Sequence, residues 1–207
     1  MIIKKFARLA QKTMECTFYG LGTNGAALSC GGAIYLLPDV ARPQTDEQLR
    51  VMMDVPTDKW LDIHSEIEAT ARIEAVGSAN LLPIMEDDET LEPLPFAIYE
   101  PNCRFNCVLI SESGRLVFFN DMYLAPIADV MKKSEFISFA ARKMGNGGAY
   151  IIVQDGMDDV LAAIMPVKVD MRVYCEKIAQ FESLCAAELA RRKLDVADDA
   201  ELEDTTQ

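Results

Sequence analysis

The sequence predicts an α+β fold made of antiparallel sheets, each backed by a short helix, with a further helix near the C-terminal end. Half of the 207 residues are hydrophobic, so the chain has enough apolar side chains for a real core. Between residues 103 and 169 the apolar pattern gives, in order, strand, strand, helix, strand, strand and strand. After residue 170 the apolar period changes to that of a helix.

Residues 3–14 are predicted to form a short amphipathic helix with a basic face. Phe6, Leu9 and Ala10 recur at helical spacing and form its apolar side. The first twelve residues contain no acidic side chain. An ordinary solvated helix face is the alternative interpretation of this run. Its cations are Lys4, Lys5, Arg8 and Lys12.

Two strands and their turns follow the first helix. Residues 16–22 and 26–37 have the composition of strands, and the turn Thr23-Asn24-Gly25 joins them, because an Asn-Gly pair is a strong hairpin signal. The glycine clusters at residues 31–32 and 145–148 lack the lysine and helix cap of a phosphate-binding loop. They are therefore predicted to be turns as well.

A helix, an exposed strand and a long loop complete the first hundred residues. Thr45 is the predicted N-cap of a helix that Pro56 ends. Residues 67–76 alternate apolar and polar side chains, which predicts a half-exposed strand. Residues 80–102 contain four prolines and an acidic cluster, so they are predicted to form a connecting loop. This loop is the expected boundary of an N-terminal α+β half, residues 1–100.

The second half, residues 101–170, carries the strand and helix order described first. Pro126 is compatible with a helix only in its first turn, so the helix is placed at residues 123–133. The predicted strands are residues 103–110, 115–120, 136–143, 149–154 and 160–169.

The C-terminal part is predicted to be a helix followed by an acidic tail. Residues 171–194 carry an apolar stripe that includes Tyr174, Ile178 and Phe181, with cations in the last turn. Residues 195–207 concentrate acidic side chains and are expected to be disordered.

Two short motifs bracket the helix and strands of the second half. Phe119-Asn120, two further residues and Tyr123-Leu124 open the helix, and Met165-Pro166-Val167-Lys168-Val169 ends the last strand. Here the chain resembles the bacterial DNA sliding clamp, the beta subunit of the replicative polymerase. The last half-domain of that family begins with Phe-Asn, two variable residues and Tyr, and it ends in Met-Pro-Met-Arg-Leu. The segment Thr23 to Leu28 is similar to the clamp's Thr-Asp-Gly-x-Arg-Leu turn, with Ala27 in place of the arginine.

The resemblance covers residues 105–169 best and the rest of the chain poorly. The chain is shorter than the three-domain bacterial subunit and continues past the point where that subunit ends. Its length is near that of two-domain phage clamps, which close a ring as trimers. Residues 1–100 are the candidate for a second, diverged clamp unit.

A clamp-like protein would encircle double-stranded DNA as a homo-oligomer and make weak, non-sequence-specific phosphate contacts that permit sliding. The formal charge of −13 argues against nucleic-acid binding by bulk electrostatics. It suits the clamp family, whose outer surface is acidic while the helices lining the hole are basic. The resulting DNA-facing candidates are Lys4, Lys5, Arg8, Lys12, Lys132 and Lys133.

The resemblance also implies a surface pocket for short apolar clamp-binding peptides. In the family this pocket is built from the Thr-Asp-Gly turn and the C-terminal strand. Plain core packing and turn chemistry account equally well for the same residues. The matching positions are Thr23, Gly25, Leu28, Met165, Pro166 and Val167.

Other function classes find less support in the sequence. Six cysteines without a CxxC pair and a single histidine, His64, predict neither a metal site nor a cofactor. Cys30 and His64 could pair for nucleophilic chemistry, but no motif surrounds any cysteine, so we do not expect an enzyme. No apolar run is long enough for a membrane helix and no signal peptide is recognisable, which predicts a cytoplasmic protein with no membrane partner.

A second hypothesis is a clamp-fold interaction module that does not encircle DNA, because fold alone does not fix function. The added C-terminal helix favours it, since an amphipathic stripe must be buried on its own chain or on a partner. Oligomeric state separates the two hypotheses. A closed ring requires a discrete multimer, whereas an interaction module can be a monomer or a dimer.

Overall fold

The computed structural model describes residues 2–22, 25–38, 40–100, 104–145, 147–156 and 159–168, together with Glu176 and Ser183. Met1–Val167 form one compact unit and Lys168–Gln207 form another. Glu176 and Ser183, within the predicted C-terminal helix, are both helical. The rest of that helix and the predicted tail, residues 195–207, lie outside the described residues.

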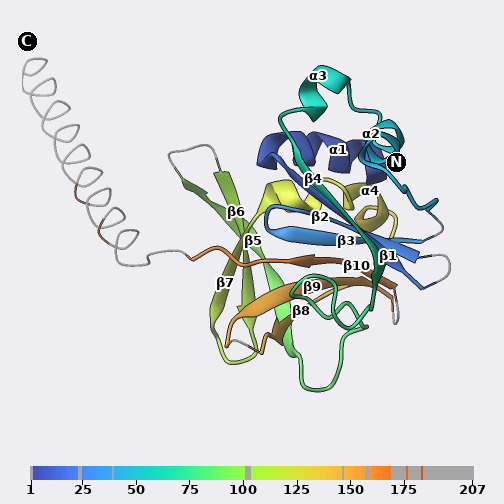
Figure 1. The fold of residues 1–207 in the computed structure, drawn as a ribbon. Helices are drawn as coiled ribbons and strands as arrows, with labels where there is room; N and C mark the ends of the chain where they lie inside the picture. Colours follow the sequence, from blue (N-terminus) through green and yellow to red (C-terminus); the bar gives the residue numbers. More distant parts are fainter. Residues whose placement is uncertain are drawn as a thin grey trace, which may run out of the picture. The chain divides into compact units, whose positions relative to one another are not determined.

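The first unit is built on a single sheet of ten strands in the order β4-β1-β2-β3-β10-β9-β8-β5-β6-β7 (Figure 1). This confirms the α+β class but replaces the expected separate sheets with one continuous sheet. All neighbouring strands are antiparallel except β1 and β4, which are parallel. The strands are β1 (Glu15–Leu21), β2 (Gly25–Cys30), β3 (Ala33–Pro38), β4 (His64–Ala71), β5 (Glu89–Glu100), β6 (Arg104–Ser111), β7 (Leu116–Asn120), β8 (Ile137–Lys143), β9 (Ala149–Asp155) and β10 (Asp159–Ile164).

The centre of the sheet joins two halves of the same design. In the first half, helix α1 (Ile2–Thr13) precedes the meander β1–β2–β3. In the second half, a 3₁₀ turn, η1 (Asp121–Leu124), and helix α4 (Ala128–Met131) precede the meander β8–β9–β10. Strands β3 and β10 pair antiparallel at the centre. Outward from this pair, each meander has its last strand first, then its middle strand and then its first strand.

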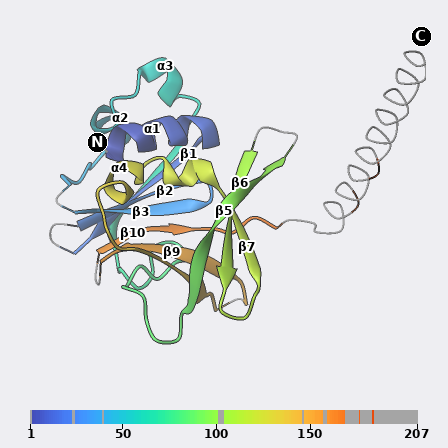
Figure 2. The same ribbon diagram turned by 180° about the vertical axis from the view of Figure 1, so that it is seen from behind.

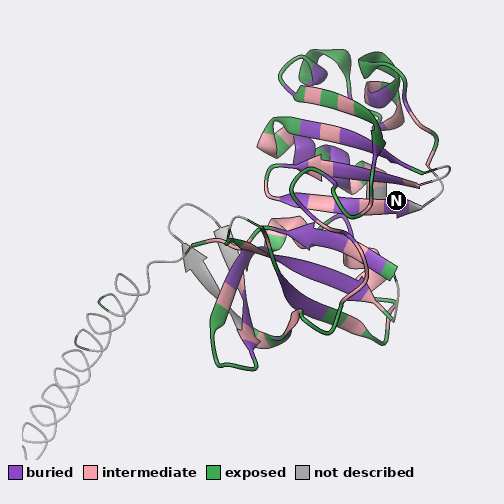
Figure 3. Ribbon diagram, turned by 60° about the horizontal axis from the view of Figure 1, so that its bottom comes forward, coloured by how far each residue is buried: buried purple, intermediate pink, exposed green. Residues whose placement is uncertain are grey.

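Both helical segments cover the same face of the sheet. Figures 1 and 2 show α1 and α4 side by side on that face, with α2 (Asp46–Met52) and α3 (Thr57–Trp60) beyond α1. The core beneath them includes Phe6, Tyr35 and Phe119, each at most 1% exposed. The rings of Phe6 and Tyr35 meet edge to face, with centroids 5.7 Å apart. Figure 3 shows the buried residues running along the central strands.

The opposite face is covered by the segment between β4 and β5. Val76 and Leu81 pack there against Tyr150 and Ile152. Arg142, on β8, holds this segment in place through its ion pair with Asp88 and its hydrogen bonds to backbone carbonyls. The sheet therefore has a hydrophobic layer on each side, and the helices occupy only one of them.

Several predicted strands are confirmed. Strands β6, β7, β8 and β9 lie within one or two residues of their predicted bounds. The last strand, predicted to continue to residue 169, ends at Ile164. Beyond it, Met165 N donates to Gly32 O at 2.7 Å, and Val167 forms an isolated bridge with Phe118 of β7.

Other predictions were wrong or only partly confirmed. Residues 26–37 form two strands, because a turn at Gly31, with φ of 53°, separates β2 from β3. The predicted loop at residues 80–102 contains the long strand β5. The predicted helix at residues 123–133 is divided into η1 and α4. The strand predicted at residues 67–76 is β4, which begins and ends earlier.

Candidate nucleic-acid interface

Helix α1 turns its cations away from the sheet. Phe6, Leu9 and Ala10 are at most 3% exposed and pack into the core. Lys4, Arg8 and Lys12 follow one another at intervals of four residues, and all three side chains are exposed. Positions four apart lie on the same side of a helix, so these cations form a stripe along the solvent side of α1.

The cations predicted at the end of the second helix lie on this same side of the sheet. Lys132 and Lys133 follow α4 directly and are exposed. The Lys5 Nζ atom lies 2.8 Å from Asp129 Oδ1, which ties α1 to α4. The structure thus brings the two predicted sets together. We call this set the basic face, and it consists of Lys4, Lys5, Arg8, Lys12, Lys132 and Lys133.

Tyr123 positions the second helical segment against the first half. Its hydroxyl oxygen accepts a hydrogen bond from Gly32 N at 3.0 Å, and its carbonyl accepts one from the Tyr35 hydroxyl at 2.8 Å. Asn120 begins η1, since its Oδ1 accepts from Met122 N at 3.0 Å. Within the motif that resembles the clamp family, Asn120 and Tyr123 therefore have identifiable structural tasks.

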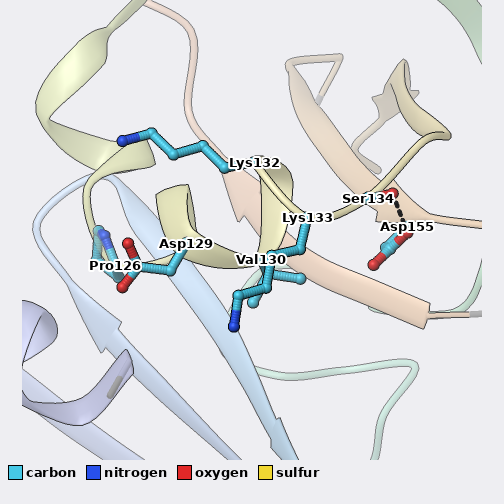
Figure 4. Close-up of a pocket in the computed structure, with 7 residues that line it drawn as sticks. All are labelled: Pro126, Asp129, Val130, Lys132, Lys133, Ser134 and Asp155. Carbon is cyan, nitrogen blue, oxygen red and sulfur yellow. Dashed lines mark hydrogen bonds between the residues drawn. The ribbon is translucent and has the colours of Figure 1, made fainter.

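Two hollows flank the second helical segment. One, of about 370 Å³, lies between α1 and residues 122–128 and is lined by both cations and apolar side chains. The other, of about 660 Å³, lies beside α4, and Figure 4 shows Lys132 and Lys133 leaving the helix in different directions. The first is lined by Lys5, Arg8, Leu9, Lys12, Met122, Ala125 and Ala128. The second is lined by Pro126, Asp129, Val130, Lys132, Lys133, Ser134 and Asp155.

Two carboxylates on the basic face were missed by the sequence analysis. Asp129 pairs with Lys5, and its pKa is lowered by the hydrogen bond from Lys5 and by the charges of Lys5, Lys132 and Lys133. Asp54 pairs with Lys4, its Oδ2 lying 3.6 Å from the ammonium nitrogen. Asp129 precedes Lys132 and Lys133 by three and four residues, which is the spacing of helical ion pairs. That spacing could have identified it.

The predicted peptide pocket is not assembled by the fold. Gly25 begins β2, whereas Met165 bonds to Gly32 at the other end of the β2–β3 hairpin, roughly 20 Å away at about 3.3 Å per strand residue. Leu28 is fully buried and offers no surface. Thr23 lies outside the described residues.

Met165, Pro166 and Val167 follow β10 and lead to β7, where Val167 meets Phe118. Met165 is 42% exposed and borders a small cavity of about 90 Å³ together with Gly31, Gly32 and Tyr150. Val167 bridges to Phe118 instead of facing a groove. Of the six predicted pocket residues, Met165 alone lines this cavity.

The cysteine and histidine of the enzyme hypothesis are held apart. Cys30 is 1% exposed, and burial raises the pKa of its thiol far above the ordinary value, which disfavours the nucleophilic thiolate. His64 lies on β4, two strands from Cys30, and its exposed ring contacts Glu66 at 3.2 Å. Neighbouring strands are about 4.8 Å apart, so the two side chains do not meet.

Within the described residues, no group of three or more His, Cys, Asp or Glu side chains is arranged to hold a metal ion. None of the described helices is both long enough and apolar enough to cross a bilayer. Comparison of the chain with family models, with curated proteins and with solved structures gave no match.

Proposed function

We propose that this chain is a sliding-clamp-type protein that contacts double-stranded DNA through its basic face without reading base sequence. The observation that carries the proposal is the paired design of residues 2–167. Two halves of helix and three-stranded meander join at β3 and β10, and both helical segments lie on one face of the sheet. All cations of the basic face except the half-buried Lys5 are exposed.

The charge distribution agrees with this role. The whole chain carries a formal charge of −13, so duplex DNA would be repelled by the molecule as a whole. The six cations of the basic face are concentrated on the helical side. Such a face gives phosphate contacts that are weak, numerous and sequence-independent, which is what movement along a duplex requires.

A matched pair of arginine variants tests the contact. Arg8 lies on the basic face and Arg72 lies on the segment that covers the opposite face, and both are exposed. Arg8→Glu is expected to weaken binding to a duplex and to reduce the salt slope by about one, whereas Arg72→Glu leaves both unchanged. Equal effects of the two variants, or binding by the unmodified protein that does not respond to salt, would remove the basic face as the contact.

Encirclement needs a separate measurement. A closed ring is retained on circular DNA and is lost from the ends once the same DNA is cut. We therefore expect the loaded protein to remain on a nicked circle through gel filtration and to leave it after linearisation. Equal retention on both forms would point to ordinary surface binding.

An interaction module without encirclement is the second candidate, and the hollow between α1 and residues 122–128 favours it. Leu9, Met122 and Ala125 line this hollow together with cations, and phosphate contacts do not require such apolar side chains. An acidic amphipathic peptide would contact both the cations and the apolar side chains of this lining. Binding of such a peptide together with equal retention on circular and linear DNA would select this candidate.

A further inference from the structure

The two ion pairs on the basic face differ in how firmly they are made. Lys5 Nζ lies 2.8 Å from Asp129 Oδ1, and the two side chains are 31% and 42% exposed. Lys4 Nζ lies 3.6 Å from Asp54 Oδ2, and these side chains are 76% and 79% exposed. Exposed pairs of the second kind contribute little, because water and salt screen them. The pair between Lys5 and Asp129 is the closer and the better shielded of the two.

The charges of further cations also act on Asp129. Lys132 and Lys133 follow it at three and four residues, and all three side chains line the hollow beside α4 (Figure 4). The hydrogen bond from Lys5, then the charges of Lys5, Lys132 and Lys133, hold the pKa of the Asp129 carboxyl below its ordinary value. Asp129 is therefore an anion that pairs with Lys5 of the first half and is influenced by the charges of Lys132 and Lys133 of the second half.

We propose that Asp129 is an internal counterion that occupies the position of a DNA phosphate at Lys5 and so limits how tightly the basic face binds a duplex. This inference rests on the proposed function. A carboxylate and a phosphate oxygen compete for the same ammonium group, and Lys5 contacts DNA only after it leaves Asp129. Asp129 thus lowers the affinity of the basic face for DNA, although it makes no contact with DNA itself.

The consequence is a lower affinity of the basic face for DNA. If every cation were free, each would add a phosphate contact. Each contact makes the plot of log affinity against log salt concentration steeper by about 0.9. Holding Lys5 on Asp129 removes one such contact from the bound state. Weaker contacts shorten the time that the protein spends at any one position on DNA.

The test uses Asp129→Asn, with Asp54→Asn as the matched control. Both variants remove one negative charge from the same face, but only Asp129 lies in the shielded pair. Affinity for a 30-base-pair duplex is measured by fluorescence anisotropy between 50 and 300 mM salt. Asp129→Asn is expected to bind about fivefold to tenfold more tightly at about 100 mM salt, with a slope steeper by about one. Asp54→Asn is expected to change affinity by less than about twofold.

A third variant isolates the pair itself. In a Lys5→Gln background, Asp129→Asn is expected to lose most of its effect, because the cation that it releases is gone. Thermal unfolding of each variant checks that α4 is intact. If the unmodified protein binds DNA and Asp129→Asn binds no more tightly than Asp54→Asn, the counterion role is overturned while the proposed function stands. If neither the unmodified protein nor Asp129→Asn binds DNA, both are overturned.

Discussion

Arg142 is a charged side chain buried between β8 and the segment that covers one face of the sheet. It is 4% exposed, and its partner Asp88 is 3% exposed in its side chain. The guanidinium also donates to the carbonyl oxygens of Asn80, Leu82 and Pro83, at 2.7 to 2.9 Å. Breaking a buried ion pair from one side leaves the other charge without a partner in a poorly solvated place, and that is costly.

Replacing Arg142 by alanine is therefore expected to lower the free energy of unfolding by about 3–5 kcal/mol. The matched control is Arg115→Ala, because Arg115 pairs with Glu89 at 2.6 Å on the surface, with side chains 56% and 32% exposed. That loss is expected to be about 1 kcal/mol or less. Urea unfolding followed by circular dichroism measures both. Equal losses for the two variants would show that burial of the Arg142 pair adds nothing.

Two buried thiols make stability depend on alkaline pH. Burial raises the pKa of Cys16 to about 12, from an ordinary 9.0, and also raises that of Cys30. The unfolded chain loses these protons near the ordinary thiol pKa of 9.0, whereas the folded chain keeps them. Their contribution is full below that pH and is lost as pH rises toward the folded pKa. We expect the free energy of unfolding to fall by about 1.4 kcal/mol per pH unit per thiol above pH 9.

The Cys16→Ala variant checks this assignment. Unfolding is measured in urea at pH 8, 9, 10 and 11 for both proteins. The variant starts less stable because it loses packed volume, but its free energy of unfolding should fall less steeply with pH than that of the unmodified protein. Parallel pH profiles would mean that the thiol of Cys16 is not responsible.

Among the elements, the β2–β3 turn makes a contact between the two halves of the sheet in addition to the pairing of β3 with β10. Gly31 has a φ of 53°, and a Cβ there would lie 2.9 Å from the Thr13 side chain and 3.1 Å from the Tyr123 hydroxyl. The adjacent Gly32 N–H is bonded to that hydroxyl. The turn therefore touches the end of α1 and the beginning of the second helical segment together.

Substitutions at this turn are expected to loosen the basic face. Tyr123→Phe removes the hydrogen bond from Gly32 N–H and should cost about 1 kcal/mol of unfolding free energy. Gly31→Ala adds both left-handed strain and a steric contact, so it should cost more, about 1–3 kcal/mol. Hydrogen exchange of residues 121–131 should accelerate in both variants. Unchanged exchange would separate the turn from the second helical segment.

The elements that the sequence predicted well are those with short-range signals. Strands β6 to β9 alternate or run apolar between clear turn residues, and the stripe of cations on α1 follows from helical spacing alone. Strand β5 was missed because Pro93 and Pro95 argue against a strand. The register of β5 against β6 shifts between Pro93 and Ala97, and such an irregularity accommodates prolines that cannot join a regular ladder.

The candidate site was likewise predicted only in part. The cations were predicted residue by residue, but their meeting on one face depends on β3 pairing with β10, which no local pattern reveals. The prediction of the peptide pocket was wrong for the same reason. Gly25 lies at the open end of the β2–β3 hairpin, whereas Met165 bonds to Gly32 at its turn, and the second strand of this hairpin was not recognised. The sequence therefore predicted which residues carry charge on each helix, but not which distant segments the fold brings side by side.

At the scale of the whole molecule, the proposed function requires assembly. Residues 2–167 contribute a single sheet and one basic face, so one copy has no means of surrounding a duplex. We expect a discrete homo-oligomer in sedimentation velocity, with a molecular mass that does not drift with concentration in the micromolar range. A monomer at all concentrations would exclude a stable closed ring and leave the interaction module.

The pairing of β3 with β10 also fixes the order in which the molecule can be completed. Ala33 pairs with Ile164, so the middle of the sheet stays open until nearly all of the first unit has left the ribosome. Until then β3, which includes the fully buried Tyr35, presents an unpaired apolar edge to the solvent. Closing the long loop between β3 and β10 is slow, and the nascent chain is prone to aggregate before these strands pair. Productive synthesis of this protein is therefore expected to depend on chaperones that cover an exposed strand edge.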